Sequence, residues 1–165
     1  MLKMIFATGV NGEFGLNGSL PWGHNKDDLK NFQEYTKGAR LVMGARTFES
    51  LPRRLPNRLN IVISSRAVRA GNGDTPDLIL SSKDVSGLIT SMARGEEDIV
   101  VIGGASLIEL MSEHVDEMNH TVIDGDFDCD VRVDLKKVYE GVQDLQNEKI
   151  SYYNWGNTLI LNRGK

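Results

Sequence analysis

The chain of 165 residues has a mass of 18.3 kDa, the size of one domain, and we expect a single domain over residues 1–165. Its 19 basic and 23 acidic residues give a net charge of −4, which argues against a nucleic-acid-binding protein because such proteins usually carry a basic surface. The single cysteine, Cys129, cannot form an internal disulfide. No signal-peptide pattern and no apolar run of about 18 residues is present, so we expect a cytoplasmic protein without a membrane partner.

Apolar, β-branched runs alternate along the chain with segments that have helical spacing. In chain order we expect a strand over Met4–Thr8, a helix over Lys26–Thr36, a strand over Leu41–Met43, a helix over Arg46–Leu51, strands over Asn60–Ser64 and Leu78–Leu80, a helix over Asp84–Met92, a strand over Ile99–Ile102, a helix over Ala105–His114 and a strand over His120–Ile123. This alternation predicts βαβ units, and therefore an α/β fold with a mostly parallel, twisted central sheet and about four flanking helices.

The pattern changes after Asp124. The segments Ser151–Trp155 and Asn157–Asn162, hinged at Gly156, predict an antiparallel hairpin that closes the sheet. The polar segment Arg69–Pro76 is rich in turn residues and is expected to be a loop within the domain.

Two segments share one organisation, in which an apolar strand is followed by glycine and then by the start of a helix. The first surrounds Gly44, and the second surrounds Gly103 and Gly104. In a parallel sheet both turns lie at the carboxyl edge of the strands, where helix N-termini and glycine backbones bind phosphate. Neither turn matches the P-loop or the G-x-G-x-x-G pattern, so each is either half of a dinucleotide site or only a tight turn.

Cationic and hydroxyl side chains lie near these turns. Arg46 is in the first turn of a helix, where a cation opposes the helix dipole and either points to solvent or meets an anion. Ser64, Ser65 and Arg66 offer hydroxyls and a guanidinium to a phosphate monoester, although Arg66 is equally well explained as a solvated surface residue. Together, Arg46 and Arg66 would select NADPH over NADH through its 2′-phosphate.

The glycine-rich loop Gly15–Gly23 carries Trp22, which we expect to be exposed. This composition is typical of a mobile loop that closes over a site, and the alternative is a surface loop pinned by one aromatic residue.

The helix that follows this loop places a carboxylate among aromatic residues. Asn25 is expected to cap it, and helical spacing puts Asp28, Phe32 and Tyr35 on one face. A carboxylate beside aromatic rings can bind an amidine-like heterocycle through two hydrogen bonds. The alternative is that Asp28 completes a capping box with Asn25 and is solvated. Asp27 lies about 100° around the helix and is expected in solvent.

Six blocks extend over essentially the whole chain in a characteristic order. They are Ile5–Ala7 leading into Gly15–Trp22, Asp28-Leu29-x-x-Phe32, Val42–Leu51, Leu55–Ser64, Val101–Gly104, and Thr121–Asp124. In this order and spacing they resemble the dihydrofolate reductase family.

The resemblance implies an NADPH-dependent enzyme that reduces 7,8-dihydrofolate to 5,6,7,8-tetrahydrofolate by hydride transfer, with protonation at N5. Such an enzyme supports one-carbon metabolism and thymidylate synthesis, works as a monomer, binds antifolates and needs no metal. One rival is a pyrimidine reductase of riboflavin synthesis with the same fold, which would not need Asp28 and Arg58 together. The other is a non-catalytic protein that binds folate or NADPH, against which the intact Asp28 and Pro21-Trp22 count.

The resemblance also implies roles for individual residues. The catalytic group is Asp28, supported by Leu20, Trp22 and Thr121, and in the expected pose a water admitted by the loop, rather than Asp28, protonates N5. The substrate-binding residues are Ile5, Phe6, Ala7, Asp28, Leu29, Phe32, Leu51, Leu55, Arg58, Ile102 and Thr121, with Arg58 paired to the α-carboxylate of the glutamate tail. The cofactor-binding residues are Ala7, Gly15, Leu16, Asn17, Gly18, Ser19, Leu20, Gly44, Ala45, Arg46, Thr47, Ser64, Ser65, Arg66, Ile102, Gly103, Gly104, Ala105, Ser106, Leu107 and Ile108. The family joins the glycines at 103 and 104 by a cis peptide bond.

The chain departs from the family pattern at several positions. The span from Trp22 to Asp28 is one residue longer than in common bacterial forms, so Asp27 competes for the role of Asp28, and the following Leu29-x-x-Phe32 favours Asp28. Other departures are Ala45 in place of a basic residue, Ile108 in place of an aromatic one, and Cys129 and Asp130 at the positions of glycine and aspartate. We expect these changes to affect kinetics and loop partnering rather than the type of reaction.

Overall fold

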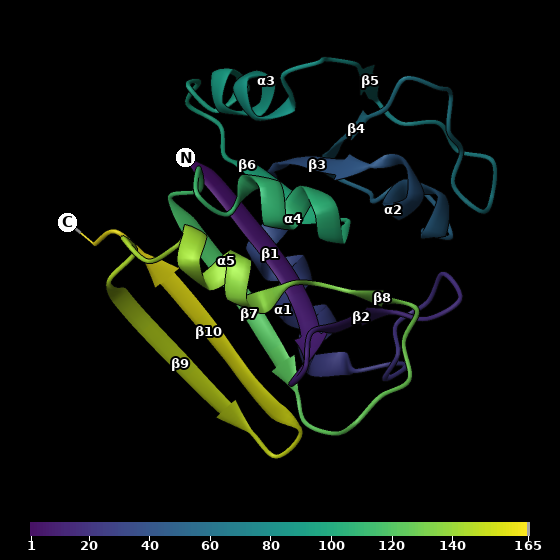
Figure 1. Cartoon of the computed structure of the whole chain (residues 1–165). Coiled ribbons are helices and arrows are strands. Elements are labelled where there is room, and N and C mark those ends of the chain that lie inside the picture. Colours follow the sequence, from purple (N-terminus) through teal and green to yellow (C-terminus); the bar gives the residue numbers. More distant parts are fainter. Residues whose placement is uncertain (165) are drawn as a thin grey trace.

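The computed structural model describes residues 1–164, so Lys165, at the end of the expected domain, lies outside the described residues. The main-sheet strands are β1 (Leu2–Gly9), β3 (Arg40–Gly44), β4 (Leu59–Ile63), β5 (Leu78–Leu80), β6 (Ile99–Gly103), β7 (Glu117–Ile123), β9 (Asn147–Tyr153) and β10 (Gly156–Asn162). Their order in the sheet is β5-β4-β3-β6-β1-β7-β10-β9 (Figure 1). The strands from β5 to β7 are parallel, whereas β10 and β9 are antiparallel. The expected α/β fold with a mostly parallel sheet and a closing hairpin is therefore confirmed.

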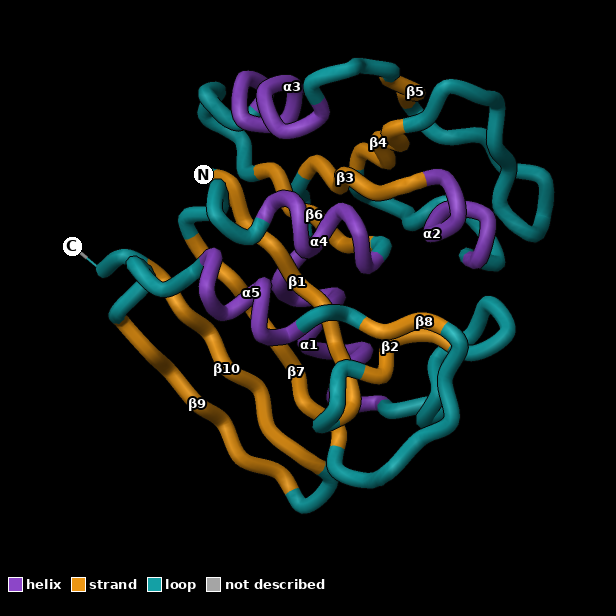
Figure 2. The backbone as a smooth tube through the Cα atoms, viewed as in Figure 1, coloured by secondary structure: helices purple, strands orange, loops and turns teal. Residues whose placement is uncertain are grey.

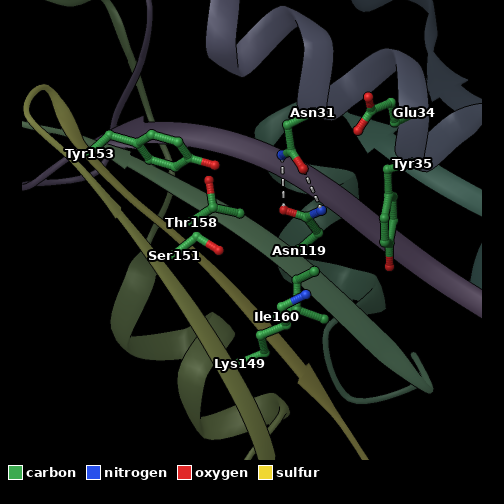
Figure 3. Close-up of a pocket in the computed structure, with 9 residues that line it drawn as sticks. All are labelled: Asn31, Glu34, Tyr35, Asn119, Lys149, Ser151, Tyr153, Thr158 and Ile160. Carbon is green, nitrogen blue, oxygen red and sulfur yellow. Dashed lines mark hydrogen bonds between the residues drawn. The ribbon is translucent and has the colours of Figure 1, made fainter.

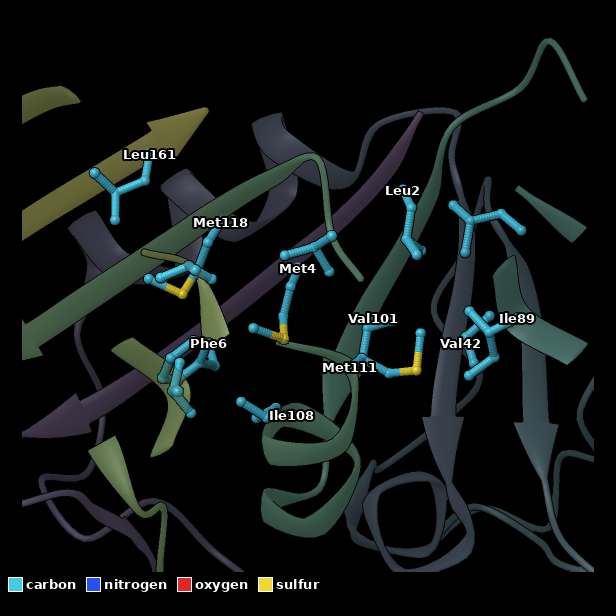
Figure 4. Packing of buried hydrophobic residues seen from close by; sticks show 14 of the residues in the cluster. Leu2, Met4, Phe6, Val42, Ile89, Val101, Ile108, Met111, Met118 and Leu161 are labelled. Carbon is cyan, nitrogen blue, oxygen red and sulfur yellow. The ribbon is translucent and has the colours of Figure 1, made fainter. Parts of the chain in front are cut away.

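Among residues 1–164, five helices cover the sheet, namely α1 (Lys26–Thr36), α2 (Ala45–Ser50), α3 (Val85–Met92), α4 (Ala105–Met111) and α5 (Leu135–Gly141). Alternate residues of each strand face opposite sides of the sheet. On one side, Met4 and Phe6 of β1 pack with residues of α3, α4 and α5 (Figure 4). On the other side, Ile5 packs with residues of α1 and α2. Within residues 1–164, no helix has the length and apolar character needed to span a bilayer.

Helix α1 begins and ends at the predicted residues. Asn25 caps it, because its side-chain oxygen accepts a hydrogen bond from the backbone N–H of Asp28 at 3.0 Å. Helix α4 instead ends at Met111, three residues before the predicted end at His114. The hydroxyl of Ser112 donates to the carbonyl of Glu109 at 3.0 Å, a bond that competes with continued helix.

Helix α5 was not predicted, and with it the helices number five rather than about four. Its start is marked by Asp134, whose side chain accepts a hydrogen bond from the backbone N–H of Lys137 at 3.2 Å. The short strands β2 (Glu13–Gly15) and β8 (Val131–Arg132) form a second sheet that was also unexpected. Figure 2 shows this pair beside the long loops that follow β2 and precede β8.

The predicted hinge of the C-terminal hairpin, Gly156, lies one residue beyond the observed turn. The chain turns at Asn154 and Trp155, and Gly156 is already the first residue of β10. The ring of Trp155 stacks on that of Tyr153, with their centroids 4.7 Å apart. Tyrosine and tryptophan have a high propensity for strands. For this reason the sequence alone predicted that the first strand continues through Trp155, which lies in the turn.

The carboxyl ends of β1, β3, β4 and β6 meet at one edge of the sheet, since these strands are parallel. These strands end at Gly9, Gly44, Ile63 and Gly103. Ligands bind open α/β sheets at this edge, and the turns predicted to bind a cofactor all lie along it.

Gly156 is required by the close approach of β10 to β7. Its φ of 154° is unfavourable for other residues, and a Cβ atom there would lie 2.0 Å from the carbonyl oxygen of Val122. We expect Gly156→Ala to lower the free energy of unfolding by about 3 kcal/mol, measured by urea denaturation. Gly95→Ala is the control, because a Cβ there would meet its neighbours only at ordinary contact distances, 3.7 Å from the tip of Arg40 and 4.0 Å from the carbonyl oxygen of Met92. Equal losses in the two variants would contradict this explanation.

Candidate active site

An apolar cluster on the α1 and α2 side of the sheet gathers most of the apolar residues predicted to bind the substrate. Ile5 is buried in this cluster, and four predicted residues, Phe32, Leu51, Leu55 and Ile102, are partly buried against it. They come from β1, α1, the segment after α2, and β6. Leu29 is 45% exposed at the same helix. The structure thus brings residues far apart in the sequence to one apolar surface that a flat ring can cover.

Asp28 lies one helical turn before Phe32 and is half-buried. Burial raises the pKa of its carboxyl, and a hydrogen bond from the hydroxyl of Thr121 opposes that rise. The backbone N–H of Asp28 donates to the side chain of Asn25, which is one half of the capping box expected as the alternative. The carboxylate itself is half-buried rather than fully solvated.

The neighbouring Asp27 is exposed, and its side chain contacts the turn between β9 and β10. Its carboxylate accepts a hydrogen bond from the indole Nε1 of Trp155 at 2.8 Å. The side chain is therefore tied to the turn between β9 and β10 rather than to the apolar cluster. The structure separates the two carboxylates that competed for one role.

Arg58 is held in place beside the cluster. Its Nε donates to the carbonyl of Pro56 at 2.9 Å, and its Nη1 donates to the hydroxyl of Thr36 at 2.9 Å. The guanidinium carbon lies 5.9 Å from the ring centroid of Phe32. Because a guanidinium has five N–H groups, this arrangement leaves three donors for a carboxylate.

The two glycine turns at the sheet edge lie against each other. A Cβ atom on Gly44 would be 3.8 Å from the backbone nitrogen of Gly104, and Cβ atoms on Gly103 and Gly104 would be 3.4 and 3.5 Å from the hydroxyl of Thr47. Gly103 and Gly104 are joined by a cis peptide bond, as expected. No side chain caps α2 or α4, whose N-cap residues are Gly44 and Gly104. Their first N–H groups are therefore available to phosphate oxygens.

The cationic residues expected at the adenosine end are exposed and share an acidic neighbour. The guanidinium of Arg66 binds both carboxylate oxygens of Glu49, at 2.6 and 3.3 Å. Hydrogen bonding from Arg66, with the charges of Arg66 and Arg46, lowers the pKa of Glu49. The hydroxyl of Ser64 bonds to the backbone of Arg66. Arg66 is therefore neither freely solvated nor fully available to an anion.

Three of the predicted side chains point away from this site. Phe6 is buried on the opposite face of the sheet and stacks on His120, with ring centroids 4.4 Å apart. Ile108 is fully buried in the same core, and Leu107 packs against that core. Since Phe6 lies between Ile5 and Ala7 in one strand, its side chain must point to the other face. The side chains of Phe6, Leu107 and Ile108 therefore do not line the site.

The loop Gly15–Gly23 is held at its tip by the segment before β8. The backbone N–H of Asn17 donates to Asp130 at 2.9 Å, which shows that the two loops are partnered. Leu20 is 51% exposed. Trp22 is half-buried and packs edge-on against Phe127 at 5.9 Å, so the expectation of an exposed indole was wrong. Its Nε1 is buried and has no partner among residues 1–164.

Glu13 is a functional candidate that the sequence analysis missed. The side chain is fully buried and accepts hydrogen bonds from the backbone N–H groups of Asn11 at 2.7 Å and Phe127 at 3.2 Å. Burial by itself raises the pKa of Glu13, but backbone hydrogen bonds and the charge of Arg132 outweigh it and hold the pKa below its ordinary value. A lone acidic residue in a short glycine-rich segment was the only sequence signal. Glu13 joins the turn after β1 to the loop that contacts the Gly15–Gly23 loop.

A second missed group is a pair of carboxamides between α1 and β7. Asn31 and Asn119 each donate to the other at 3.2 Å (Figure 3). Asn119 is fully buried, and its pairing with Asn31 satisfies the amides of both. Neither residue belongs to a local motif, because the pairing depends on how the helix packs on the strand.

Replacing Glu13 tests the buried carboxylate. We expect Glu13→Ala to lower the free energy of unfolding by about 3 kcal/mol, because it removes a buried side chain and leaves the N–H groups of Asn11 and Phe127 without this acceptor, and Glu13→Gln to cost less. The folded-state pKa lies below the ordinary value of 4.5, so the stabilisation is present above pH 4.5 and is lost as the pH falls through the folded-state pKa. Chemical denaturation from about pH 5 downward should show a smaller loss for Glu13→Gln than for the unmodified protein. Parallel pH profiles would contradict this role.

Comparisons with known proteins agree with this geometry. A family model described as dihydrofolate reductase matches residues 1–152. The dihydrofolate reductase of Bacillus subtilis is 38% identical over 130 residues, which cover 79% of this chain and 73% of that protein. The dihydrofolate reductase of Staphylococcus aureus is 36% identical over 126 residues, which cover 76% of this chain and 73% of that protein.

A solved structure extends the similarity to the fold. The dihydrofolate reductase from Enterococcus faecalis, complexed with NADP(H) and RAB-propyl, superposes with a TM-score of 0.77 at 26% sequence identity. The superposition covers 100% of this chain and 97% of that one.

Proposed function

The chain belongs to the dihydrofolate reductase family, and from this we propose that Asp28 is the group that holds the pterin ring of its substrate. The chain reduces 7,8-dihydrofolate to 5,6,7,8-tetrahydrofolate with NADPH. Family membership favours this reaction over pyrimidine reduction and over a non-catalytic role. The observation that carries the proposal is the half-buried carboxylate of Asp28 beside Phe32, supported by Thr121.

The two carboxylate oxygens of Asp28 can accept hydrogen bonds from the 2-amino group and the adjacent ring nitrogen of a pterin. Such paired, charge-assisted bonds fix the ring in one orientation. Ile5, Phe32 and Leu51 supply the apolar surface on which the ring lies. Arg58, already fixed by Thr36, has donors left for the α-carboxylate of the glutamate tail.

The sheet edge fits a dinucleotide. Adding a Cβ to Gly103 would bring it within 3.4 Å of Thr47, so the glycine backbones leave room that side chains would fill. We assign Gly44, Thr47, Gly103 and Gly104 to the pyrophosphate of NADPH. Ser64, Ser65, Arg46 and Arg66 are assigned to its 2′-phosphate, and the loop Gly15–Trp22 to its nicotinamide. Bound NADPH supplies the hydride.

The protein then orients the substrate and controls water. Asp28 holds the ring through hydrogen bonds and its charge, which is a gain in proximity and orientation. The buried indole N–H of Trp22 lacks a partner among residues 1–164, so a water or a ligand oxygen would satisfy it. We assign the protonation of N5 to a water admitted beside this loop.

We further propose that the protein acts as a cytoplasmic monomer and binds antifolates in the substrate site. A planar diaminoheterocycle presents the same paired donors to Asp28 as the substrate does.

Replacing Asp28 tests the central assignment. We expect Asp28→Asn to lower kcat/KM for dihydrofolate by at least about 100-fold, measured by the loss of NADPH absorbance, while circular dichroism shows an intact fold. Asp27→Asn is the matched control, because Asp27 is exposed and contacts Trp155. Near-normal rates in Asp28→Asn, or a comparable loss in Asp27→Asn, would refute the assignment.

Replacing Arg58 tests the position of the glutamate tail. We expect Arg58→Leu to raise KM for dihydrofolate by about 10- to 100-fold, because a charge-assisted bond is lost. A dihydropterin without a glutamate tail should show the same kinetics with Arg58→Leu as with the unmodified protein. Arg94→Leu, on an exposed segment after α3, serves as the control. An equal effect on both substrates would show that Arg58 does not bind the tail.

A further inference from the structure

The loop between β7 and β8, residues 124–130, is tied at both ends by backbone hydrogen bonds. The first residue donates to the turn between β9 and β10 at 2.8 Å, and the last donates to the carbonyl of Gly15 at 2.9 Å. In the middle of the loop, over residues 125–129, one hydrogen bond is found within the described part of the chain. The backbone N–H of Phe127 donates to the carboxylate of Glu13 at 3.2 Å. The middle of this loop is therefore held by a side chain of β2.

Glu13 can reach this loop because the end of β1 leaves room for its carboxylate. A Cβ atom on Gly9 would lie 2.7 Å from the carboxyl carbon of Glu13 and 2.7 and 2.8 Å from its two oxygens, so a side chain there would displace the carboxylate. One of these oxygens accepts a hydrogen bond from the backbone N–H of Asn11 at 2.7 Å, and the other accepts the bond from Phe127. Each oxygen thus has its own backbone donor.

The ring of Phe127 connects this anchor to Trp22. The ring lies edge-on to the indole, with 5.9 Å between their centroids, and both side chains are half-buried. Gly125 leaves space for the ring, because its φ is 127° and a Cβ atom there would lie 2.8 Å from Cζ of Phe127. Aromatic pairs have preferred geometries, so a displacement of Phe127 changes the position of the indole.

The indole of Trp22 has a polar atom that is free to bind a ligand or a water. Its Nε1 is buried and has no hydrogen-bond partner among residues 1–164. We propose that Glu13 is a positioning residue, which fixes Phe127 and, through its ring, the direction in which the N–H of Trp22 points. The inference rests on the proposed function, because the loop Gly15–Trp22 is assigned to the nicotinamide and to the water that protonates N5. Glu13 itself needs to touch neither.

The surroundings of Glu13 show what the carboxylate adds. The loop that it holds repels a further negative charge, because it contains four aspartates, Asp124, Asp126, Asp128 and Asp130. The guanidinium of Arg132 lies 4.0 Å from the carboxylate and offsets part of this repulsion. An apolar side chain would fill the same space without that cost. The carboxylate instead provides bonds of fixed direction to two backbone N–H groups, one of which belongs to Phe127.

The test follows the fluorescence of Trp22 in the ligand-free protein. The chain has two tryptophans, so Trp155→Phe makes Trp22 the only indole. In this background we expect Glu13→Met, which keeps the volume but removes both acceptors, to shift the emission of Trp22 to longer wavelength and to raise its quenching by acrylamide. Gly9→Ala should give the same change, because its Cβ displaces the carboxylate without removing it. In the Phe127→Ala background, Glu13→Met should add nothing to the change.

The reaction supplies a second measurement. We expect Glu13→Met to lower kcat for dihydrofolate about 3- to 10-fold, the factor that corresponds to one or two lost hydrogen bonds. The ratio of KM for dihydrofolate to that for a dihydropterin without a glutamate tail should not change, because Arg58 keeps its contacts. Circular dichroism checks that the folded fraction is unchanged. Glu109→Met is the matched control and should alter neither emission nor kcat, because the Glu109 carboxylate accepts a backbone N–H of a different segment, that of Asp134 at 3.1 Å.

The outcomes separate this proposal from the proposed function. Unchanged emission of Trp22 in Glu13→Met and Gly9→Ala overturns it, as does an equal shift in Glu109→Met or a shift that Glu13→Met still adds in the Phe127→Ala background. A shift in emission with an unchanged kcat overturns the role of Glu13 in the reaction. Because the fluorescence needs neither substrate nor NADPH, its result stands whatever Asp28→Asn does to the reductase activity.

Discussion

A carboxylate placed partly out of water must be balanced by polar groups, and this requirement organises the packing of α1 on β7. From Asp28 to Tyr35 the helix rises about 10 Å, and from Thr121 to Glu117 the strand spans about 13 Å. The two distances are similar, so three side chains of the helix meet three side chains of the strand in turn. An interface between a helix and a sheet is usually apolar. Here the polar atoms satisfy one another, which avoids the cost of leaving them buried and unpaired.

The two ends of the active site use charge differently. At the pterin end, one half-buried carboxylate acts where solvent screening is weak. At the adenosine end, Arg46, Glu49 and Arg66 are all exposed, and the carboxylate of Glu49 forms a salt bridge with the guanidinium of Arg66. Exposed charges contribute little each and are screened by salt. Orientation of the substrate therefore depends on few atoms, whereas recognition of the cofactor is spread over backbone N–H groups and surface charges.

The sequence predicted the features that depend on local chemistry. Asn25 marked the start of α1, and the continuous apolar run of β6 marked a central strand. The order of motifs indicated Asp28 rather than Asp27, and the structure places the two carboxylates apart. Phe6 and Ile108 were assigned by resemblance alone, and strand alternation or helix facing would have placed them in the core. Glu13 and Asn31 were missed because most of their partners lie more than 80 residues away in the sequence, so no local pattern contains them.

A polar cavity of about 390 Å³ lies between α1 and the β9–β10 hairpin. It is bounded by the helix that carries Asp28, yet its walls include none of the residues assigned to the pterin or to the nucleotide. Helix α1 therefore has two polar surroundings, with Asp28 on the side of the apolar cluster and Asn31 on the side of this cavity.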